Sequence, residues 1–533
     1  MLPAADPHDD AEYRSQGWWG ATTLDLRVAE LAGSRPDDDA FRWGDRRLTW
    51  RGYDATADEI ARRLVGEGLG RGDRALVFLP DGGGVHAAFL GCERAGVVAV
   101  GVGSRAGKRE LSHLCARTGA TVAVLPSDTP HGAARELVAE LGLRSFVTID
   151  DRDDGVAIGA GPTGDPAGRA LGPSELWLLN STSGTTGLPK CVMQTLNRWA
   201  FFHRIAAEYG GLRADDVWMS LLPAPYGFGL WTAHVSPTLL GGTCVVQSRF
   251  DAERATAEIE ANRVTVLAAV SSQFVMLLDA AGDRDLSSLR VLFTGGEAIS
   301  PVRAREFEQR TGCRVLNFYG SNETGLLSGT RHDDPLERRI TTGGRVIDEM
   351  RVRLYDLDGV RLPGDIGQGR PACKGPATAL GYWDDPTANT ELFTEDGWMF
   401  MGDVVRIDED GWLSVVARTA DFIIRGGKNI SAPAVEDEVG THPSVALAAA
   451  VPVPDERLGE RVGVFVELRP DAAPGLTLAE VTAHLAERGV SKEWWPEHLW
   501  VLPELPRSSG GKLAKGELRE RARSGATTRH DPS

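Results

Sequence analysis

Hydroxyl-bearing residues and glycines gather in the run from Ser181 to Lys190, which reads Ser-Thr-Ser-Gly-Thr-Thr-Gly-Leu-Pro-Lys. Glycines let backbone N–H groups approach an anion closely, hydroxyls add hydrogen-bond donors, and a lysine supplies a point charge. The segment is not a Walker loop, because its glycine spacing differs and Cys191 follows the lysine. A flexible linker would not explain the closing Pro-Lys pair. The run therefore predicts a phosphate-binding loop made of Thr182, Ser183, Gly184, Thr185, Thr186, Gly187 and Lys190.

A second stretch combines an aromatic ring with a carboxylate in the order Asn317-Phe318-Tyr319-Gly320-Ser321-Asn322-Glu323-Thr324. It follows a predicted strand, and open α/β sheets bind their ligands at the carboxyl ends of strands. We expect Tyr319 to stack on a nucleotide base and Glu323 to hold Mg²⁺ through its hard oxygen. The alternative is a capped turn with Tyr319 in the core.

Three further segments place charged residues beside glycines. Asp403 follows Gly402 and could chelate two vicinal hydroxyls, as on ribose, although an Asp after Gly is more often a turn residue. Residues 418–430 pair charges with glycines and indicate a hinge or, alternatively, a solvated linker. Lys512 ends a glycine-rich turn from which it could enter a neighbouring cleft and neutralise a carboxylate and a phosphate oxygen. An exposed structural lysine is the alternative.

These groups need a large α/β framework to position them. Apolar runs alternate with helical patterns over most of the first 320 residues, and this β-α-β rhythm favours a parallel sheet with helices on its faces. Residues 151–173, rich in Gly, Asp, Ala and Pro, are expected to form a surface connection. After about Ile340 the pattern changes to that of an antiparallel module, and from about Phe422 to that of a smaller α+β unit.

The length of 533 residues is too great for one ordinary core. We predict four parts: an N-terminal body over residues 1–417, a hinge over 418–421, a small mobile C-terminal domain over 422–523, and a disordered tail over 524–533. Trp18 and Trp19 are expected to dock the N-terminal arm onto the body.

The composition restricts the possible partners. With 75 acidic and 58 basic residues the net charge is −17, which argues against general affinity for nucleic acid or anionic membranes. The six cysteines form no Cys-x-x-Cys pair and are typical of reduced, mostly buried thiols. The N-terminus lacks the features of a signal peptide, and no apolar run has the length of a membrane span. We therefore expect a cytoplasmic protein, either a monomer or a homodimer.

Taken in order, these segments resemble those of the adenylate-forming superfamily, which includes acyl-CoA synthetases, nonribosomal adenylation domains and beetle luciferases. The resemblance extends from about Leu26 to Leu518. Three other passages are also family-like: Phe293-Thr294-Gly295-Gly296-Glu297, Leu380-Gly381-Tyr382-Trp383, and the run from Val451 to Glu460. The passage from Lys492 to Glu497 looks most like cyclohexanecarboxylate and related fatty acyl-CoA ligases.

The resemblance implies a two-step reaction and a role for each motif. A carboxylate and MgATP give acyl-AMP and pyrophosphate, and then the small domain rotates and a thiol, usually coenzyme A, takes the acyl group. Lys512, Thr185 and Glu323 would be catalytic, with Glu323 on Mg²⁺. The nucleotide would be bound by the phosphate loop and by Gly295, Gly296, Glu297, Asn317, Tyr319, Gly320, Asp403 and Arg418.

The chain departs from the family pattern at several positions. Leu196 stands where a histidine is frequent, and Met401 replaces the usual threonine before Gly402-Asp403. Tyr226 stands where a histidine or an aromatic residue gates the acyl pocket. Ala420 occupies the pivot of the hinge, where Asp or Lys is usual. Since a hinge residue mainly absorbs φ/ψ change, alanine could still serve.

The acyl pocket is expected at Tyr226, Gly227, Phe228 and Trp231. Amino-acid-activating relatives carry an Asp at the position of Gly227, so an α-amino acid is disfavoured. The aromatic residues match an aryl, alicyclic or short-to-medium aliphatic acid. Three functions remain open: a carboxylate–CoA ligase, which we favour, an enzyme that loads a separate carrier protein, and an acyl-adenylate-binding protein with impaired turnover.

Overall fold

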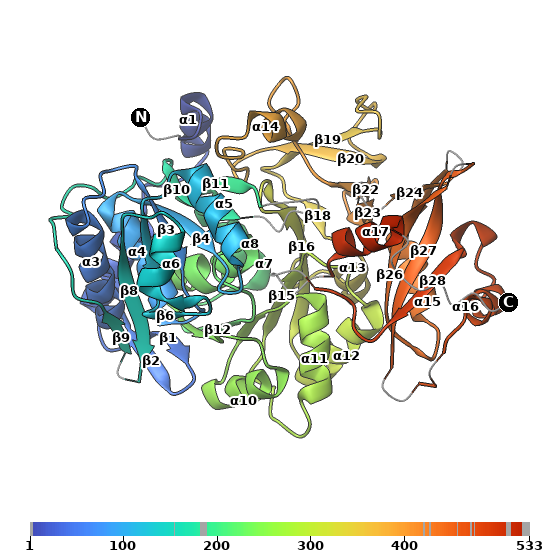
Figure 1. Ribbon diagram of the computed structural model, residues 1–533, viewed down its shortest axis with the longest axis horizontal. Helices are drawn as coiled ribbons and strands as arrows, with labels where there is room; N and C mark the ends of the chain where they lie inside the picture. The colour runs from blue at the N-terminus through green and yellow to red at the C-terminus, as the bar shows by residue number, and fades with distance from the viewer. Residues whose placement is uncertain are drawn as a thin grey trace.

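The computed structural model describes residues 4–153, 155–181, 189–418, 422–425, 428–455, 457–469, 472–473, 475–507 and 513–524. Within these ranges the chain forms a large N-terminal body around three sheets and a smaller C-terminal domain around a fourth, seen at the right of Figure 1. The predicted α/β body with a smaller α+β domain is confirmed. The predicted residue boundaries between these parts stay a prediction.

The largest sheet has nine strands, and its central strands pair in parallel. Helices connect these strands, as parallel pairing requires. The strands are buried on both faces and therefore read as apolar runs; β15 is buried along its whole length. The order is β18 (Arg345–Val346), β17 (Gly325–Gly329), β16 (Arg314–Ser321), β15 (Val291–Gly295), β14 (Val266–Ala268), β12 (Val217–Ser220), β13 (Thr243–Val246), β1 (Asp39–Trp43) and β2 (Arg46–Thr49).

A seven-stranded sheet forms the second layer. Its order is β11 (Cys191–Thr195), β10 (Leu176–Ser181), β4 (Val98–Val102), β3 (Arg74–Phe78), β5 (Val122–Leu125), β8 (Ser145–Arg152) and β9 (Gly155–Ile158). The expectation of a plain connection over residues 151–173 was wrong for its first part. Gly155 has a φ of +131°, which lets the chain turn back so that β9 pairs antiparallel with β8.

Helices cover the sheets of the body, and helix α1 was not expected. Its first turn is capped by Asp6, whose Oδ1 accepts from the backbone N–H of His8 at 2.8 Å. The predicted docking of the arm is confirmed for Trp19, whose Nε1 donates to the carbonyl of Pro376 at 3.0 Å. The helices of the body are α1 (Pro7–Ser15), α2 (Leu24–Ser34), α3 (Trp50–Gly66), α4 (Gly83–Ala95), α5 (Lys108–Thr118), α6 (Ala134–Glu140), α7 (Leu196–Gly210), α8 (Gly227–Gly229), α9 (Ser236–Leu240), α10 (Ala252–Asn262), α11 (Ser271–Ala280), α12 (Pro301–Thr311), α13 (Leu336–Thr341) and α14 (Pro386–Leu392).

The third sheet and the C-terminal domain complete the chain. A π-helical segment, η1 (Leu230–Val235), and a small hairpin, β6 (Asp128–Thr129) with β7 (Gly132–Ala133), also belong to the body. The third sheet contains β19 (Arg351–Tyr355), β20 (Gly367–Lys374), β21 (Met399–Phe400), β22 (Asp403–Ile407) and β23 (Leu413–Arg418). The C-terminal domain contains β24 (Phe422–Arg425), β25 (Lys428–Ser431), β26 (Val445–Asp455), β27 (Gly459–Leu468), β28 (His498–Leu502), α15 (Ala432–Gly440), α16 (Leu478–Glu487), α17 (Lys515–Ser524) and the 3₁₀ turn η3 (Lys492–Trp494).

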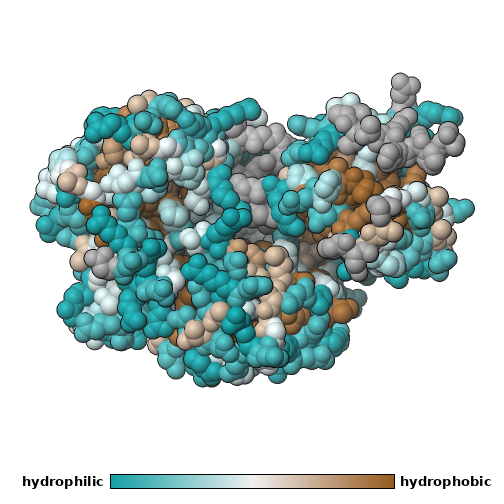
Figure 2. All heavy atoms as spheres, turned by 60° about the horizontal axis from the view of Figure 1, so that its bottom comes forward, coloured by the Kyte–Doolittle hydropathy of each residue, from teal (hydrophilic) through white to brown (hydrophobic). Residues whose placement is uncertain are grey.

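The hydropathy of the surface agrees with a composition that includes 25% charged residues. Figure 2 shows a mostly hydrophilic face, with hydrophobic side chains gathering over the C-terminal domain at the right. All six cysteines are buried and free, as predicted. Across the described ranges, no helix combines the length and apolar character needed to cross a membrane.

Candidate active site

The carboxyl end of β16 turns back on itself into β17, and a register shift separates Tyr319 from Gly320 in this pair. A Cβ on Gly320 would lie 1.8 Å from the carbonyl oxygen of Gly325, so only glycine fits there. The Ser321 Oγ caps the turn by accepting from the backbone N–H groups of Glu323 at 3.2 Å and Thr324 at 3.1 Å. The turn therefore holds the backbone of Glu323 in a defined place at the end of the parallel sheet.

Tyr319 connects this strand to the third sheet. Its ring is 8% exposed, and its hydroxyl donates to Oδ2 of Asp403 at 2.8 Å. Asp403 begins β22 and so is not the turn residue that the sequence left open; its strand neighbour across the pair is Arg418. The two residues expected at the base and the ribose are therefore joined, although 84 positions separate them.

Glu323 is brought together with the end of the phosphate segment through Tyr382. The Tyr382 hydroxyl donates to Oε1 of Glu323 at 2.8 Å, and Nζ of Lys190 lies 4.8 Å from the centre of the Tyr382 ring. Burial, and then the nearby Glu323 carboxylate, raise the pKa of Tyr382. Tyr382 therefore stays a protonated donor that orients the carboxylate. The sequence places Tyr382 in a family-like passage but indicates no role for it.

The Gly-Gly-Glu passage lies at the end of β15, next to β16. A Cβ on Gly295 would lie 2.3 Å from the carbonyl oxygen of Phe318, and Gly296 has a φ of +73°. Both positions thus favour glycine for structural reasons. The Glu297 carboxylate accepts from the backbone N–H and the hydroxyl of Ser272, both at 3.1 Å, in the first turn of α11. Asn317, in β16, is held by a hydrogen bond that its Nδ2 donates to the carbonyl oxygen of Thr342 at 2.8 Å.

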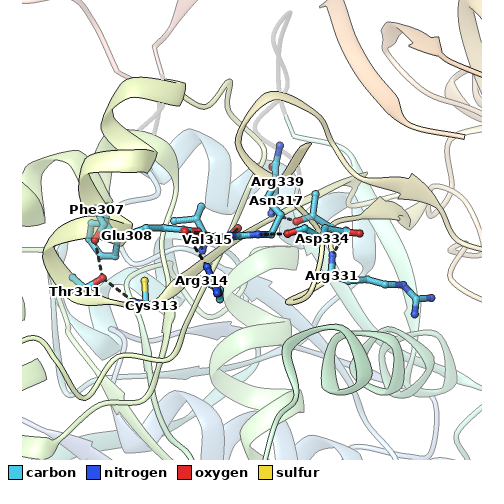
Figure 3. A network of polar contacts seen from close by, with 11 residues as sticks. Phe307, Glu308, Thr311, Cys313, Arg314, Val315, Asn317, Arg331, Asp334 and Arg339 are labelled. Atoms are coloured by element: carbon cyan, nitrogen blue, oxygen red, sulfur yellow. Dashed lines mark hydrogen bonds and ion pairs between the residues drawn. The ribbon is translucent and has the colours of Figure 1, made fainter. Parts of the chain in front are cut away.

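A buried ion pair is attached to the backbone of β16 (Figure 3). Arg339 on α13 is 1% exposed and its guanidinium forms a two-pronged pair with the Glu308 carboxylate of α12. Arg339 also donates to the carbonyl of Val315 at 3.2 Å, and Oε1 of Glu308 accepts from the Val315 N–H at 2.7 Å. The pair therefore attaches two helices to the strand that carries Tyr319. Sequence patterns gave no signal for it.

The expected acyl segment follows β12 and leads into η1. Trp231 is 1% exposed and stacks on Phe202 at 4.3 Å and on Phe228 at 5.7 Å between ring centres. It therefore lies in the core beneath Phe228. Tyr226 lies against Gly103, where a Cβ would be 2.6 Å from the Tyr226 hydroxyl oxygen. The segment is thus an aromatic wall supported by a buried aromatic cluster.

A buried amide network lies under this wall. Asn180 and Gln194 are fully buried, and Nε2 of Gln194 donates to Oδ1 of Asn180 at 2.8 Å. Asn180 and Asn322 exchange two hydrogen bonds, at 2.8 and 2.9 Å. Arg198 donates to Gln194 and to the carbonyl of Asn322, and burial lowers the pKa of Arg198 to about 9. The network joins the strand before the phosphate loop to the turn that carries Glu323.

Several predicted residues lie outside the described ranges. These are Thr182, Ser183, Gly184, Thr185, Thr186 and Gly187 of the phosphate loop, Ala420 of the hinge, and Lys512. The described chain reaches this loop on both sides, through β10 and through Lys190 and β11. Leu196, at the family's histidine position, is 2% exposed and begins α7.

The donor set suits a nucleotide better than a metal cage. Among the residues that the structure describes, no group of three or more His, Cys, Asp or Glu side chains could hold a metal ion. Mg²⁺ is commonly bound by one or two carboxylates together with substrate phosphates. A half-buried Glu323, oriented by Tyr382, whose ring also lies against the lysine of the phosphate segment, fits that arrangement.

Comparison with known proteins agrees with this geometry. The model of the AMP-binding enzyme family matches residues 28–383, and that of the AMP-binding enzyme C-terminal domain matches residues 434–512. The chain belongs to the AMP-binding enzyme family. The predicted adenylate-forming resemblance is confirmed, and the protein is an enzyme of this AMP-forming, acid-activating class.

Relatives of this AMP-binding enzyme align over nearly the whole chain. The 2-hydroxy-7-methoxy-5-methyl-1-naphthoate–CoA ligase of Streptomyces carzinostaticus is 33% identical over 96% of this chain and 95% of its own. The salicylyl-CoA synthase / salicylate adenylyltransferase of a Streptomyces species is 35% identical over 95% of both chains. The apo structure of Mycobacterium smegmatis MbtA has a TM-score of 0.71 and 31% identity over 98% of both chains.

Proposed function

We propose that this AMP-binding enzyme is a carboxylate–CoA ligase for an apolar, preferably aryl, carboxylic acid, with ATP, Mg²⁺ and coenzyme A as cosubstrates and cofactor. The observation that carries the proposal is the joining of four distant motifs around β16. Tyr319 donates a hydrogen bond to Asp403, and Tyr382 donates one to Glu323 while its ring lies against Lys190. The two similar chains named above both act, by their names, on 2-hydroxyaryl acids.

The chemistry requires two anions to react. In the first step a carboxylate oxygen attacks the α-phosphorus of ATP, the bond to the β-phosphate bridging oxygen breaks, and pyrophosphate leaves. Positive charge and fixed donors must neutralise and align both anions. Lys190 supplies charge at the phosphate segment, and Lys512 is proposed to supply it at the carboxylate. The Asp403–Tyr319 pair would hold the ribose and base, and Mg²⁺ at Glu323 would withdraw charge from the phosphates.

In the second step a thiolate sulfur attacks the acyl carbonyl carbon, and the bond to the phosphate oxygen breaks so that AMP leaves. We propose that the C-terminal domain rotates about residues 418–421 between the two steps. The aromatic segment from Tyr226 to Trp231 would exclude water from the acyl group. An aryl acid fits this wall best because aromatic rings stack on one another favourably.

The choice of thiol separates the proposal from its main alternative, a carrier protein bearing phosphopantetheine. Purified enzyme is incubated with MgATP and a panel of aryl, alicyclic and aliphatic acids, with and without coenzyme A. AMP release and acyl-CoA mass are measured together, and Lys512→Ala serves as the matched control. An acyl-CoA product that depends on one class of acid is the expected result.

Acid-dependent AMP release without a thioester product would favour the carrier protein as acceptor. Absence of AMP release with every acid would contradict the ligase and favour an acyl-adenylate-binding protein. A Lys512→Ala variant that adenylates as fast as wild type would contradict the role of that lysine, since loss of one such group costs about 10²–10³ in rate.

A further inference from the structure

Arg198, in the first turn of α7, is a buried cation without an ion-pair partner among the residues that the structure describes. Its side chain is 1% exposed. Burial lowers the pKa of Arg198 to about 9, and the nearby Glu323 carboxylate acts in the opposite direction, so the group stays charged at neutral pH. Arg339, which is buried to the same degree, is paired with the Glu308 carboxylate instead. A buried charge without such a pair is costly, which indicates that its donors are needed where they lie.

All three nitrogens of this guanidinium donate hydrogen bonds to backbone carbonyl groups. Nε donates to the carbonyl oxygen of Ala377 at 2.7 Å, Nη1 to that of Asn322 at 3.0 Å, and Nη2 to that of Glu323 at 3.3 Å. Nη1 also donates to Oε1 of Gln194. A guanidinium presents five donors in one rigid plane, whereas a lysine ammonium is a compact charge on a flexible chain. Arg198 therefore holds carbonyl groups from two segments that are distant in the sequence.

The first of these segments is the turn that carries Glu323. The carbonyl oxygen of Glu323 accepts from Arg198 and also from the backbone N–H of Ala379 at 2.7 Å. The chain passes so close here that a Cβ on Gly325 would lie 2.4 Å from the carbonyl oxygen of Ala377 and 3.0 Å from Nη2 of Arg198. The turn after β16 and the segment from Ala377 to Ala379 are thus packed around one guanidinium.

The second segment leads to Tyr382, the hydrogen-bond partner of the Glu323 carboxylate. The backbone just before Tyr382 is attached to β11, because the N–H of Met193 donates to the carbonyl oxygen of Gly381 at 2.9 Å. The Tyr382 hydroxyl donates to Oε1 of Glu323 at 2.8 Å. Both ends of this hydrogen bond therefore lie on segments that Arg198 joins, so the guanidinium sets where the carboxylate stands relative to the hydroxyl that orients it.

We propose that Arg198 is a positioning residue of the metal site, which fixes the turn of Glu323 through three carbonyl groups and so presents the carboxylate to the Mg²⁺ that accompanies ATP. The inference rests on the proposed function, because it takes Glu323 as the Mg²⁺ ligand. Groups that orient a metal ligand change metal affinity by about 10–100-fold when they are replaced. Arg198 acts here through the backbone of the ligand and not through the metal itself.

The test measures metal binding in the absence of the reaction. Mn²⁺, which stands in for Mg²⁺, is titrated into the enzyme with one equivalent of ATP and no carboxylic acid, and free Mn²⁺ is followed by electron paramagnetic resonance, with ATP alone as the blank. Arg198→Lys keeps the positive charge but cannot hold three carbonyl groups, so it should weaken Mn²⁺ binding about tenfold. A Mn²⁺ affinity equal to that of wild type would overturn the proposal.

Arg339→Lys is the matched control, because Arg339 is equally buried but contacts β16 at Val315 and not the turn of Glu323. It should lower the melting temperature and keep the Mn²⁺ affinity within about twofold of wild type. Equal losses of Mn²⁺ affinity in the two lysine variants would indicate general loosening and contradict the proposal. Gly325→Ala, which forces a methyl group into the same junction, is a second variant should Arg198→Lys fold poorly; it should also weaken Mn²⁺ binding, and an unchanged affinity would contradict the role of the junction.

Acid-dependent AMP release distinguishes failure of this inference from failure of the proposed function. In Arg198→Lys the Mg²⁺ concentration for half-maximal rate should rise about tenfold, while the KM for the acid stays within about twofold of wild type. Wild type that releases AMP, together with an Arg198→Lys variant of unchanged Mn²⁺ affinity, contradicts the inference alone. Wild type that binds Mn²⁺ with ATP but releases no AMP with any acid contradicts the proposed function, and the Mn²⁺ titration of the variant still decides the role of Arg198.

Discussion

The two parallel sheets of the N-terminal body place carboxylates at corresponding ends but use them differently. After β16 of the nine-stranded sheet, Glu323 accepts from a side-chain hydroxyl, that of Tyr382. Near the ends of β3 and β8 in the seven-stranded sheet, Asp81 and Asp151 accept from backbone N–H groups instead. Asp81 bonds to Ala224 at 2.6 Å and Asp151 to Gly84 at 3.0 Å.

The kind of hydrogen-bond partner distinguishes Glu323, the proposed Mg²⁺ ligand, from Asp81 and Asp151, which hold loops in place. Asp81 and Asp151 line a cavity of about 440 Å³, and burial raises their pKa values to about 7 and about 6. Through Ala224, Asp81 holds the segment that leads to Tyr226. Glu323 is oriented by the hydroxyl of Tyr382, and the centre of the Tyr382 ring lies 4.8 Å from Nζ of Lys190. Under the proposed function, the same topological position serves chemistry in one sheet and loop geometry in the other.

The largest expected effect concerns how the nine-stranded sheet is held. Arg339→Met should lower the free energy of unfolding by about 3 kcal/mol, because the buried Glu308 carboxylate loses its two-pronged partner and keeps only the looser pair with Arg314 at 3.7 Å. The neighbouring Arg338 is a suitable control, since it makes a half-exposed pair with Asp408 at 3.2 Å. Arg338→Met should cost less than about 1 kcal/mol. Urea unfolding followed by tryptophan fluorescence measures both, and equal losses would remove the special role of the buried pair.

The next effect compares the carboxylates of the two sheets directly. Glu323→Gln should slow acyl-AMP formation by about 10²–10³, because it removes the charge that would bind Mg²⁺. Asp151→Asn keeps the acceptor for Gly84 and should stay within about threefold of wild type. Acid-dependent AMP release at saturating MgATP is the measurement. If Asp151→Asn were the slower variant, the assignment of the catalytic carboxylate to the nine-stranded sheet would be contradicted.

A smaller effect is expected from the residue that orients Glu323. Tyr382→Phe removes the 2.8 Å hydrogen bond and should lower the rate about tenfold and raise the Mg²⁺ concentration needed for half-maximal activity. Tyr355→Phe is the control, because Tyr355 is buried to the same degree in the third sheet. A Mg²⁺ dependence that is unchanged in Tyr382→Phe would show that this hydroxyl does not act through Glu323.

A separate effect, on stability rather than on rate, is a pH dependence in the seven-stranded sheet. Burial raises the pKa of Asp81 from its ordinary value of 3.8 to about 7, against the opposing effects of the Ala224 N–H and Arg105. The folded protein therefore holds this proton more tightly than the unfolded chain does. The stability that results is complete below about pH 4 and is lost as pH rises through about 7. Asp81→Asn, which keeps the acceptor without the titration, should lose less stability than wild type between about pH 5 and pH 8.

Urea unfolding at the two pH values measures this difference. Asp153→Asn is the control on the rim of the same cavity, because its side chain is fully exposed and pairs with Arg46 at 3.3 Å. Equal pH dependence in wild type and Asp81→Asn would contradict the assignment to Asp81.

Much of the framework could be predicted because its signals are local. The alternation of apolar runs with helical patterns predicted a β-α-β body, and β3, α4 and β4 follow this order. Helix α1 was missed because its nine residues are mostly polar and show little apolar periodicity. Strand β9 was missed because its four residues lie in a segment rich in turn formers.

The residues of the candidate site could likewise be predicted only where their sequence signal is local. Motif composition predicted Tyr319, Glu323, Asp403 and Lys190 as residues of interest, because a carboxylate, a ring or a lysine beside glycine has recognisable chemistry. The partners of these residues could not be predicted in the same way. Tyr382 lies 59 positions from Glu323, and Asn180 lies 142 positions from Asn322. Nothing in the local pattern around Asn180 or Gln194 distinguishes them from polar residues at a strand end.

By itself, the sequence determined the class of the protein: its family motifs, their order, and the strand ends that carry them, all of which depend on residues within a few positions of one another. The tertiary structure decided which groups act together. It joined Tyr319 to Asp403 and Tyr382 to Glu323, placed Trp231 in the core, and put the Arg198 guanidinium against the turn that carries Glu323. The physical reason is that a hydrogen bond or a steric contact depends on distance in space, which the folded sheets set and which spacing along the chain does not record.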